Sequence, residues 1–252
     1  MYRVVLTLFY PVILFFVVGL TVGSLSGPAV AERIQETHRG IYILAEEPEE
    51  EVIDGVRTTP APDAVTFIRA VIDRMSDMSS LIQNRFDDLK QAGHIVILYD
   101  ARHPDETWES INLASYFPRY YNPAAGDYNF VIIIGRTGIQ WDLDRMAAVL
   151  AHETAGHAFQ HMQGRLLQMR VLDAECEAYL IEERANQDLG VDKGSEDSIA
   201  FRQALEQHWC SDFRAFTRDN APEAHAVWEQ RDPDISALLY AFRDYLIDQN
   251  AE

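Results

Sequence analysis

An apolar stretch with ionisable residues at its centre is the feature that most constrains the fold. From Asp142 to about Gly164 the sequence predicts a helix that is apolar nearly all round, which is typical of a helix buried in a protein core. This helix nevertheless contains the segment His152–His157 (HETAGH) and then His161. A buried carboxylate such as Glu153 is costly unless it is paired or lies beside a metal. The pattern therefore predicts a metal site inside the fold.

The spacing of the two histidines in this segment requires a local irregularity. Zinc hydrolases with an H-E-x-x-H motif place two histidines at i and i+4 on one helical face, with the glutamate as general base. Here one more residue separates them, so His152 and His157 would lie about 140° apart on a regular α-helix. A π-bulge absorbs the extra residue, and Gly156 lowers the cost of the distortion. We therefore expect a π-bulge that brings both rings to one metal.

A third metal ligand is expected from the next predicted helix, which covers residues 169–189. Glu175 follows His157 at a distance that allows one turn of chain and an antiparallel return, and Glu177 is the alternative ligand. Two histidines and one carboxylate leave one zinc position open for water, which is typical of a catalytic site. Zinc lowers the pKa of that water to about 7, and Glu153 accepts its proton. The predicted site is Zn²⁺ on His152, His157 and Glu175, with Glu153 as the catalytic residue.

A regular helix would give a different ligand set. Glu153, His157 and His161 would then share one face at i, i+4 and i+8, and His152 would point elsewhere. The π-bulge is preferred because it leaves Glu153 free to act as a base and gives the carboxylate on the following helix a role. In that arrangement His161 lies outside the set of ligands.

The segment HETAGH resembles the H-E-x-x-G-H signature of the dipeptidyl peptidase III family. In that family the two histidines bind zinc and the glutamate is the base, which implies these roles for His152, His157 and Glu153. Ala174–Cys176 (AEC) resembles part of the family's second motif, E-E-C-R-A-E. The acid before the cysteine is the third ligand in that motif, and this role maps onto Glu175.

The chain also departs from that family. It is far shorter than those two-lobed enzymes, its two motifs lie closer together, and Ala174, Glu177 and Tyr179 stand where the second motif has other residues. The wider layout, from the segment 121–123 through 130–133 to 149–160, resembles small bacterial zincins. In those proteins an edge strand precedes the zinc helix and lines the substrate cleft.

The remaining pattern predicts an α+β fold. Apolar residues recur with helical spacing from Asp63 to about Gly93, and strands are expected at 94–99 and 128–134. After the zinc helix the chain is helical almost to its end, over about 169–189, 195–217 and 235–249. We expect a zincin-like domain over residues 63–252, with a small β-sheet packed on the zinc-binding helix and a mostly helical C-terminal half.

The N-terminal segment, residues 1–31, has the pattern of a targeting sequence. Arg3 precedes an apolar run from Val4 to Leu20, and Ala29–Ala31 (AVA) follows as a cleavage pattern. Two interpretations remain open: a signal peptide cleaved after Ala31, or an uncleaved membrane anchor formed by residues 4–25. Both place the rest of the protein in the periplasm or outside the cell. Residues 32–62 are expected to be a lead-in segment with a short strand at 40–44 and an acidic linker.

Charge and cysteine content limit the partners and the compartment. The formal net charge is −19, which disfavours nucleic acid as a partner. A peptide or protein is the substrate expected from the predicted zinc site. Cys176 and Cys210 are the two cysteines, and an even number in an oxidising compartment permits a disulfide. Two separate buried thiols are the alternative.

Together these patterns predict an exported zinc-dependent peptidase. The alternative is a catalytically inactive protein of zincin fold that acts in binding or as a scaffold, because the extra residue departs from the H-E-x-x-H spacing. An intact Glu153 favours the enzyme, since a structural metal site has no use for a base.

Overall fold

The computed structural model describes residues 33–104 and 113–249. The predicted signal peptide or membrane anchor, residues 1–31, lies outside these ranges. Within the described residues, none of the helices combines the length and the apolar character needed to cross a membrane.

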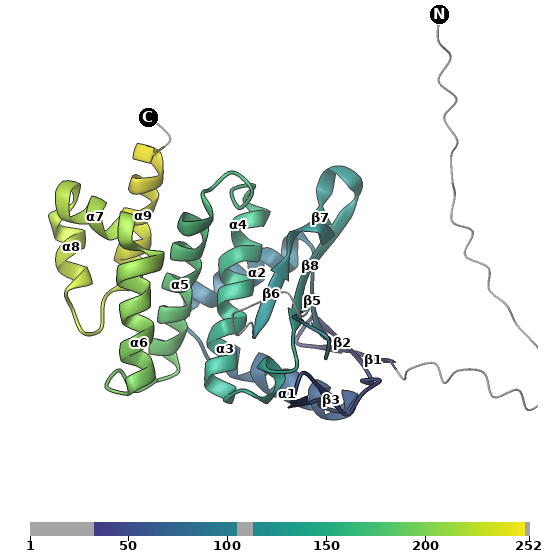
Figure 1. The fold of residues 1–252 in the computed structure, drawn as a ribbon. Coiled ribbons are helices and arrows are strands. Elements are labelled where there is room, and N and C mark those ends of the chain that lie inside the picture. The colour runs from purple at the N-terminus through teal and green to yellow at the C-terminus, as the bar shows by residue number, and fades with distance from the viewer. Residues whose placement is uncertain (1–32, 105–112, 250–252) are drawn as a thin grey trace, which may run out of the picture. The chain divides into compact units, whose positions relative to one another are not determined.

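The fold is α+β, as predicted, with a mixed sheet followed by a helical C-terminal half (Figure 1). The strands are β1 (Arg33–His38), β2 (Ile41–Glu46), β3 (Val52–Ile53), β4 (Val56–Arg57), β5 (His94–Tyr99), β6 (Ala114–Phe117), β7 (Tyr121–Asn122) and β8 (Asp127–Ile134). The α-helices are α1 (Ala61–Met75), α2 (Ser80–Ala92), α3 (Leu143–Ala151), α4 (Phe159–Met162), α5 (Val171–Asp188), α6 (Glu196–Ala204), α7 (Ser211–Asn220), α8 (Pro222–Trp228) and α9 (Ile235–Gln249). A π-helix over His152–Ala158 joins α3 to α4, and a second π-helix over Leu205–Trp209 follows α6.

The main sheet has the strand order β1-β2-β5-β8-β6, with β7 paired to β8. Strands β2, β5 and β8 are parallel, whereas β1 and β6 are antiparallel to their neighbours at the two edges. Buried and half-buried residues alternate along β5, so Ile95, Ile97 and Tyr99 point to one face. This alternation shows that helices cover mainly one face of the sheet.

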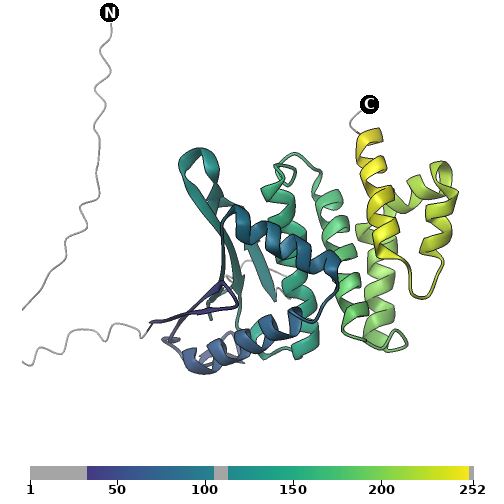
Figure 2. The same cartoon turned by 180° about the vertical axis from the view of Figure 1, so that it is seen from behind.

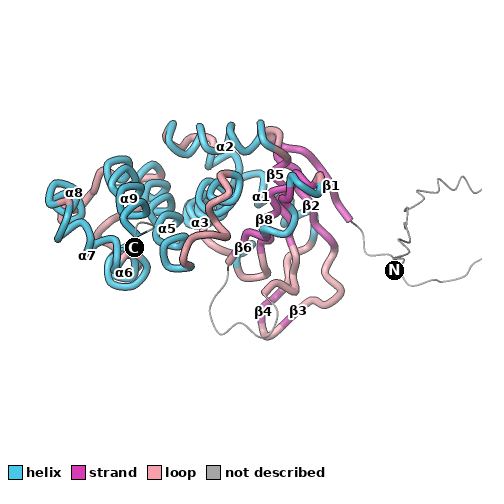
Figure 3. Tube along the Cα trace, turned by 90° about the horizontal axis from the view of Figure 1, so that it is seen from above, coloured by secondary structure: helices cyan, strands magenta, loops and turns pink. Residues whose placement is uncertain are grey.

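The helices form successive layers beside that face. Helices α1 and α2 and the rod formed by α3, the first π-helix and α4 pack on the sheet, and α5 lies against the far side of the rod (Figures 1 and 2). Seen from above, α5 separates this rod from the C-terminal helices (Figure 3). Helix α5 therefore contributes to two apolar cores, with Ile181 in the core under the sheet and Leu180 in the C-terminal core.

The single helical pattern expected from Asp63 to Gly93 is two helices in the structure. Helix α1 ends at Met75 and α2 begins at Ser80. The Ser76 hydroxyl donates to the carbonyl of Asp73 at 2.6 Å, a local bond that competes with continuation of the helix. The break lets α1 pack on α3 while α2 contacts the first π-helix.

Residues 33–57, expected as a lead-in with an acidic linker, belong to the folded unit. Strand β2 lies inside the sheet between β1 and β5, and its residues Ile41, Ile43 and Ala45 are buried. The parallel pairing of Tyr42 with Val96 joins segments far apart in the chain, so local pattern could not reveal it.

The edge of the sheet next to the predicted metal helix is β6. The strand predicted at 128–134 is β8, which lies inside the sheet between β5 and β6, so it is not the edge strand that the resemblance to zincins implied before the zinc helix. Strand β6 spans only Ala114–Phe117, in a polar, aromatic-rich stretch where the sequence predicted no strand. Four residues are too short for a clear alternation, which explains why the strand was missed.

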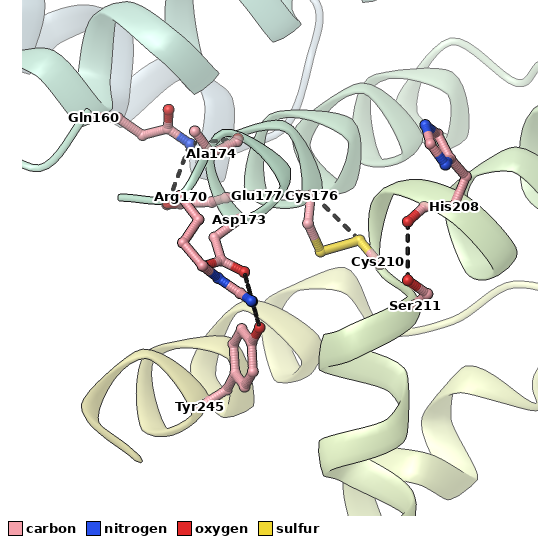
Figure 4. Close-up of a disulfide and its surroundings, with 10 residues drawn as sticks. All are labelled: Gln160, Arg170, Asp173, Ala174, Cys176, Glu177, His208, Cys210, Ser211 and Tyr245. Carbon is pink, nitrogen blue, oxygen red and sulfur yellow. Dashed lines mark hydrogen bonds and ion pairs between the residues drawn. A yellow bond between two sulfur atoms is a disulfide. The ribbon is translucent and has the colours of Figure 1, made fainter. Parts of the chain in front are cut away.

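The two cysteines form a disulfide, as predicted. The bond joins Cys176 on α5 to Cys210, the residue before α7, and both are about 1% exposed (Figure 4). It ties the helix that carries Glu175 to the C-terminal core.

Candidate metal centre

The helix that carries the HETAGH segment has the irregularity that its spacing predicted. Asp142 caps α3 by accepting from the backbone N–H groups of Asp144 and Arg145, and the regular helix ends at Ala151. Residues His152–Ala158 then form a π-helix. The wider turn places residues five apart on one face, and His152 Nε2 lies 3.1 Å from His157 Nε2.

Glu175 on α5 completes a three-residue cluster with these histidines. Its two carboxylate oxygens lie 3.5 Å from His152 Nε2 and 3.5 Å from His157 Nε2. Among the described residues, these three side chains form the one group with ligand atoms close enough to hold a metal, all within 4.8 Å of one another. Tetrahedral zinc with bonds of about 2.0–2.1 Å spaces its ligands about 3.3 Å apart. The observed spacing therefore suits Zn²⁺.

The charges around the cluster favour a cation. Burial opposes the charged form of His152, but Glu175 and Glu182 outweigh burial and raise its pKa to about 10. Burial also raises the pKa of the Glu175 carboxyl, yet the two imidazoles bring it well below its usual range. Without a metal the cluster thus holds a proton among its ligands, and metal binding would release that proton.

Glu153 lies beside the cluster and is held by the edge strand. Its side chain is buried, and Oε2 accepts a hydrogen bond of 2.7 Å from the backbone N–H of Tyr116 on β6. Burial raises the pKa of the Glu153 carboxyl, although His152 and His157 oppose that shift. A carboxylate with a raised pKa is better suited to accept and return a proton near neutral pH.

Glu182 is a site residue that the sequence reasoning missed. Its Oε2 lies 3.0 Å from His152 Nδ1, on the opposite side of the ring from the Nε2 that faces Glu175. The contact has the distance of an ion pair without the alignment of a hydrogen bond, and a carboxylate on this side of the ring favours a hydrogen on Nδ1, which leaves Nε2 for a metal. Glu175 and Glu182 are two turns apart on one face of α5, and that i, i+7 spacing was the available signal.

The alternative ligands do not join the cluster. Glu177 is bound by Arg165, whose Nη1 and Nη2 lie 2.8 and 3.0 Å from its carboxylate oxygens. The imidazole Nδ1 of His161 lies 2.8 Å from the hydroxyl of Tyr116. These contacts separate both side chains from His152 and His157, so the structure brings together the π-bulge ligand set.

Aromatic side chains lie on both sides of the cluster. The ring of Tyr179 meets His152 edge-on, with centroids 4.5 Å apart, and stacks on Trp209. On the sheet side, Tyr116 and Tyr121 both contact the ring of His161. A cavity of about 790 Å³ lined by residues of α2, α4, α5 and α9 is a separate feature, and its lining does not include His152, Glu153, His157 or Glu175.

Gly156 has a different role from the one expected. Its backbone is not in the left-handed region, so the π-helix does not depend on glycine for its conformation. A Cβ at this position would lie 2.8 Å from the Cβ and 3.0 Å from the Cα of Ala178 on α5. Glycine is therefore required because α5, which carries Glu175, approaches the π-helix very closely.

Gly156→Ala is expected to destabilise the protein by about 1–3 kcal/mol, since a backbone must move to admit the methyl group. A lower melting temperature in thermal denaturation would show this effect. Gly194→Ala is the matched control, because there the added Cβ meets only side-chain atoms of Asp192 and Arg231, at 3.3 and 3.6 Å. Equal stability of Gly156→Ala and wild type would contradict the packing argument.

Comparisons with known proteins gave no match. No protein family model matches the chain, and no curated protein or solved structure is significantly similar to it. The functional conclusion therefore rests on the geometry of the site.

Proposed function

We propose that the protein is a zinc-dependent peptidase of zincin-like fold. One observation carries the proposal: the π-helix brings His152 and His157 together with Glu175 and leaves Glu153 beside them, hydrogen-bonded to the edge strand. A structural zinc site is usually closed by four protein ligands, whereas three ligands with a neighbouring free carboxylate are typical of a hydrolytic site.

His152, His157 and Glu175 would hold the zinc ion. Bound zinc supplies a Lewis acid that lowers the pKa of a coordinated water to about 7. Glu182 keeps the ring of His152 in place from behind through its contact with Nδ1. The remaining step, the transfer of a proton, would then be carried out by Glu153.

Glu153 is placed to act as the general base. The backbone N–H of Tyr116 occupies Oε2 and thereby fixes the carboxylate, while Oε1 is available to take a proton from water. The same carboxyl group can then deliver that proton to the amine that leaves when the peptide bond breaks. Burial, which raises the pKa of Glu153, favours the first of these two transfers, because it stabilises the protonated carboxyl group.

Strand β6 supports a peptide as the substrate. It is the last strand of the main sheet, and among the described residues none pairs with its outer edge. Its residue Tyr116 contacts Glu153 directly, so an extended peptide added to this edge would lie along the metal centre. Backbone hydrogen bonds of this kind recognise peptides and have no counterpart for most other hydrolase substrates.

We place the enzyme outside the cytoplasm, in the periplasm or the extracellular space. The buried Cys176–Cys210 disulfide supports this location, because such bonds persist in oxidising compartments. Residues 1–31 would then act as the signal peptide or the membrane anchor.

Metal removal tests the proposed function. The purified protein is expected to contain one zinc ion per chain and to cleave members of a fluorescence-quenched peptide library. Treatment with 1,10-phenanthroline should abolish cleavage, and added Zn²⁺ should restore it, because Glu153 alone cannot activate water. Full activity of the metal-free protein would contradict the proposal, and a zinc-loaded protein that cleaves no peptide would support a binding or scaffold role.

A further inference from the structure

A buried amide connects one of the candidate metal ligands to the interior of the protein. Gln160 on α4 is fully buried, and its Oε1 lies 3.1 Å from Nδ1 of His157. Its Nε2 donates to the backbone carbonyl of Ala174 at 2.9 Å and to Oε2 of Glu177 at 3.3 Å. Figure 4 shows Gln160 reaching across to Ala174 and Glu177 on α5. Every polar atom of this amide therefore has a partner.

The partners of Gln160 determine which end of its amide faces the histidine. A carboxylate and a carbonyl only accept hydrogen bonds, so the amide nitrogen must face Glu177 and Ala174. The amide oxygen then faces His157, and since an oxygen only accepts, Nδ1 of His157 must carry the hydrogen. The lone pair is left on Nε2, the atom that faces His152 and Glu175.

Glu177 is in turn held as an acceptor by two arginines. Arg165 binds both of its oxygens, at 2.8 and 3.0 Å, and Arg85 Nη2 lies 3.5 Å from Oε1. Arg85 also donates through Nη1 to the carbonyl of Ala155 in the π-helix at 2.7 Å. Side chains from α2, from the segment after α4 and from α5 thus meet at Glu177, next to the π-helix.

We propose that Gln160 and Glu177 are positioning residues that fix the tautomer and the orientation of His157 for metal binding. The inference rests on the proposed metal centre and deepens it. Glu177 acts through Gln160 and touches neither the metal position nor the substrate. Glu177 therefore has a role for His157 like that of Glu182 for His152, except that Glu182 contacts the imidazole directly. Glu177, which is on the same helix as the proposed third ligand Glu175, thus has a role other than binding the metal.

The first test is the zinc dissociation constant, measured by competition with a chelator of known affinity. Gln160→Met keeps the length of the side chain but removes the amide, and we expect it to weaken zinc binding about 10–100-fold. Glu177→Gln should change affinity in the same direction, because an amide at 177 can present a donor to Gln160 and allow its amide to turn. Glu183→Gln is the matched control: Glu183 is an equally buried acid on α5, paired with Lys193, and its replacement should leave zinc affinity unchanged.

The second test needs no metal and reports the tautomer directly. ¹⁵N chemical shifts of the imidazole rings, recorded on the metal-free protein, should show His157 with hydrogen on Nδ1. Gln160→Met should shift this ring toward a mixture of tautomers. Because this measurement does not depend on zinc, it tests the contact between Gln160 and His157 even if Glu177→Gln fails to fold.

Two results would overturn the inference. One is wild-type zinc affinity in Gln160→Met, and the other is a wild-type His157 that carries its hydrogen on Nε2. A wild-type protein that binds no zinc would instead overturn the proposed function, and it would do so whatever the tautomer of His157. The two failures can therefore be told apart.

Discussion

Glu153→Gln is expected to lower the rate of peptide hydrolysis by about 10²–10⁴-fold while the protein keeps one zinc ion per chain. The amide has the shape of the carboxylate and can still accept from the backbone N–H of Tyr116. It cannot take a proton from water, so the base is lost and the metal ligands are untouched. Rates on a cleaved library peptide and zinc content measured on the same sample check both halves of the prediction.

Glu153→Gln should be at least as stable as the wild-type protein. Burial raises the pKa of the Glu153 carboxyl, which means that the folded protein disfavours the charged form. A neutral amide removes that cost, so the melting temperature at neutral pH should stay level or rise. Glu183→Gln, at a buried acid away from the centre, should keep full activity. Loss of zinc in Glu153→Gln would make Glu153 a ligand and would refute its assignment as the base.

The parts of the site that could be predicted from sequence are those set by local spacing. The distance from His152 to His157 is incompatible with a shared face on a regular helix, so a metal site required the π-helix that the structure contains. The position of Glu175 on the next helix followed from the same requirement. The even number of cysteines permitted the disulfide between Cys176 and Cys210, and the structure has this bond rather than two separate thiols.

The parts that could not be predicted depend on contacts between distant segments. Glu182 and Gln160 become relevant only when α4 and α5 lie against each other and direct these side chains at the two imidazoles. Glu177 was ambiguous for the same reason, because Arg165 and Arg85 have no sequence relationship to it. Gly156 was noticed but explained wrongly, since its closest neighbour, Ala178, is on another helix.

The fold shows the same division. The helices predicted at 169–189 and 235–249 are close to their observed bounds, whereas the patterns at 63–93 and 195–217 are each broken into separate helices. Strand β6 was not predicted, and β2 lies in a segment expected to be a lead-in. Strand β6 has only four residues, too few for a pattern of its own, and the place of β2 inside the sheet depends on its pairing with β5. Strand β6 matters most, because it holds Glu153 and forms the edge on which a peptide would bind.

His152→Ala and Glu175→Ala are each expected to abolish stoichiometric zinc binding, with dissociation constants raised by more than the roughly 100-fold expected for a residue outside the ligand shell. Each change removes one of the three proposed ligands. In His152→Ala the carboxylates of Glu175 and Glu182 remain and would still attract cations weakly. Zinc must therefore be measured in competition with a chelator, so that this weak attraction is not counted as a site.

His161→Ala is the control that separates the two ligand sets. If the chain used a regular-helix set of Glu153, His157 and His161, this variant would lose zinc and His152→Ala would keep it. In the structure His161 is bonded to the hydroxyl of Tyr116 and burial lowers its pKa, so its replacement should leave most of the zinc in place. Full zinc in His152→Ala would refute the π-helix assignment, because the wide turn at His152–Ala158 has a metal-binding purpose only if both of its histidines reach the same ion.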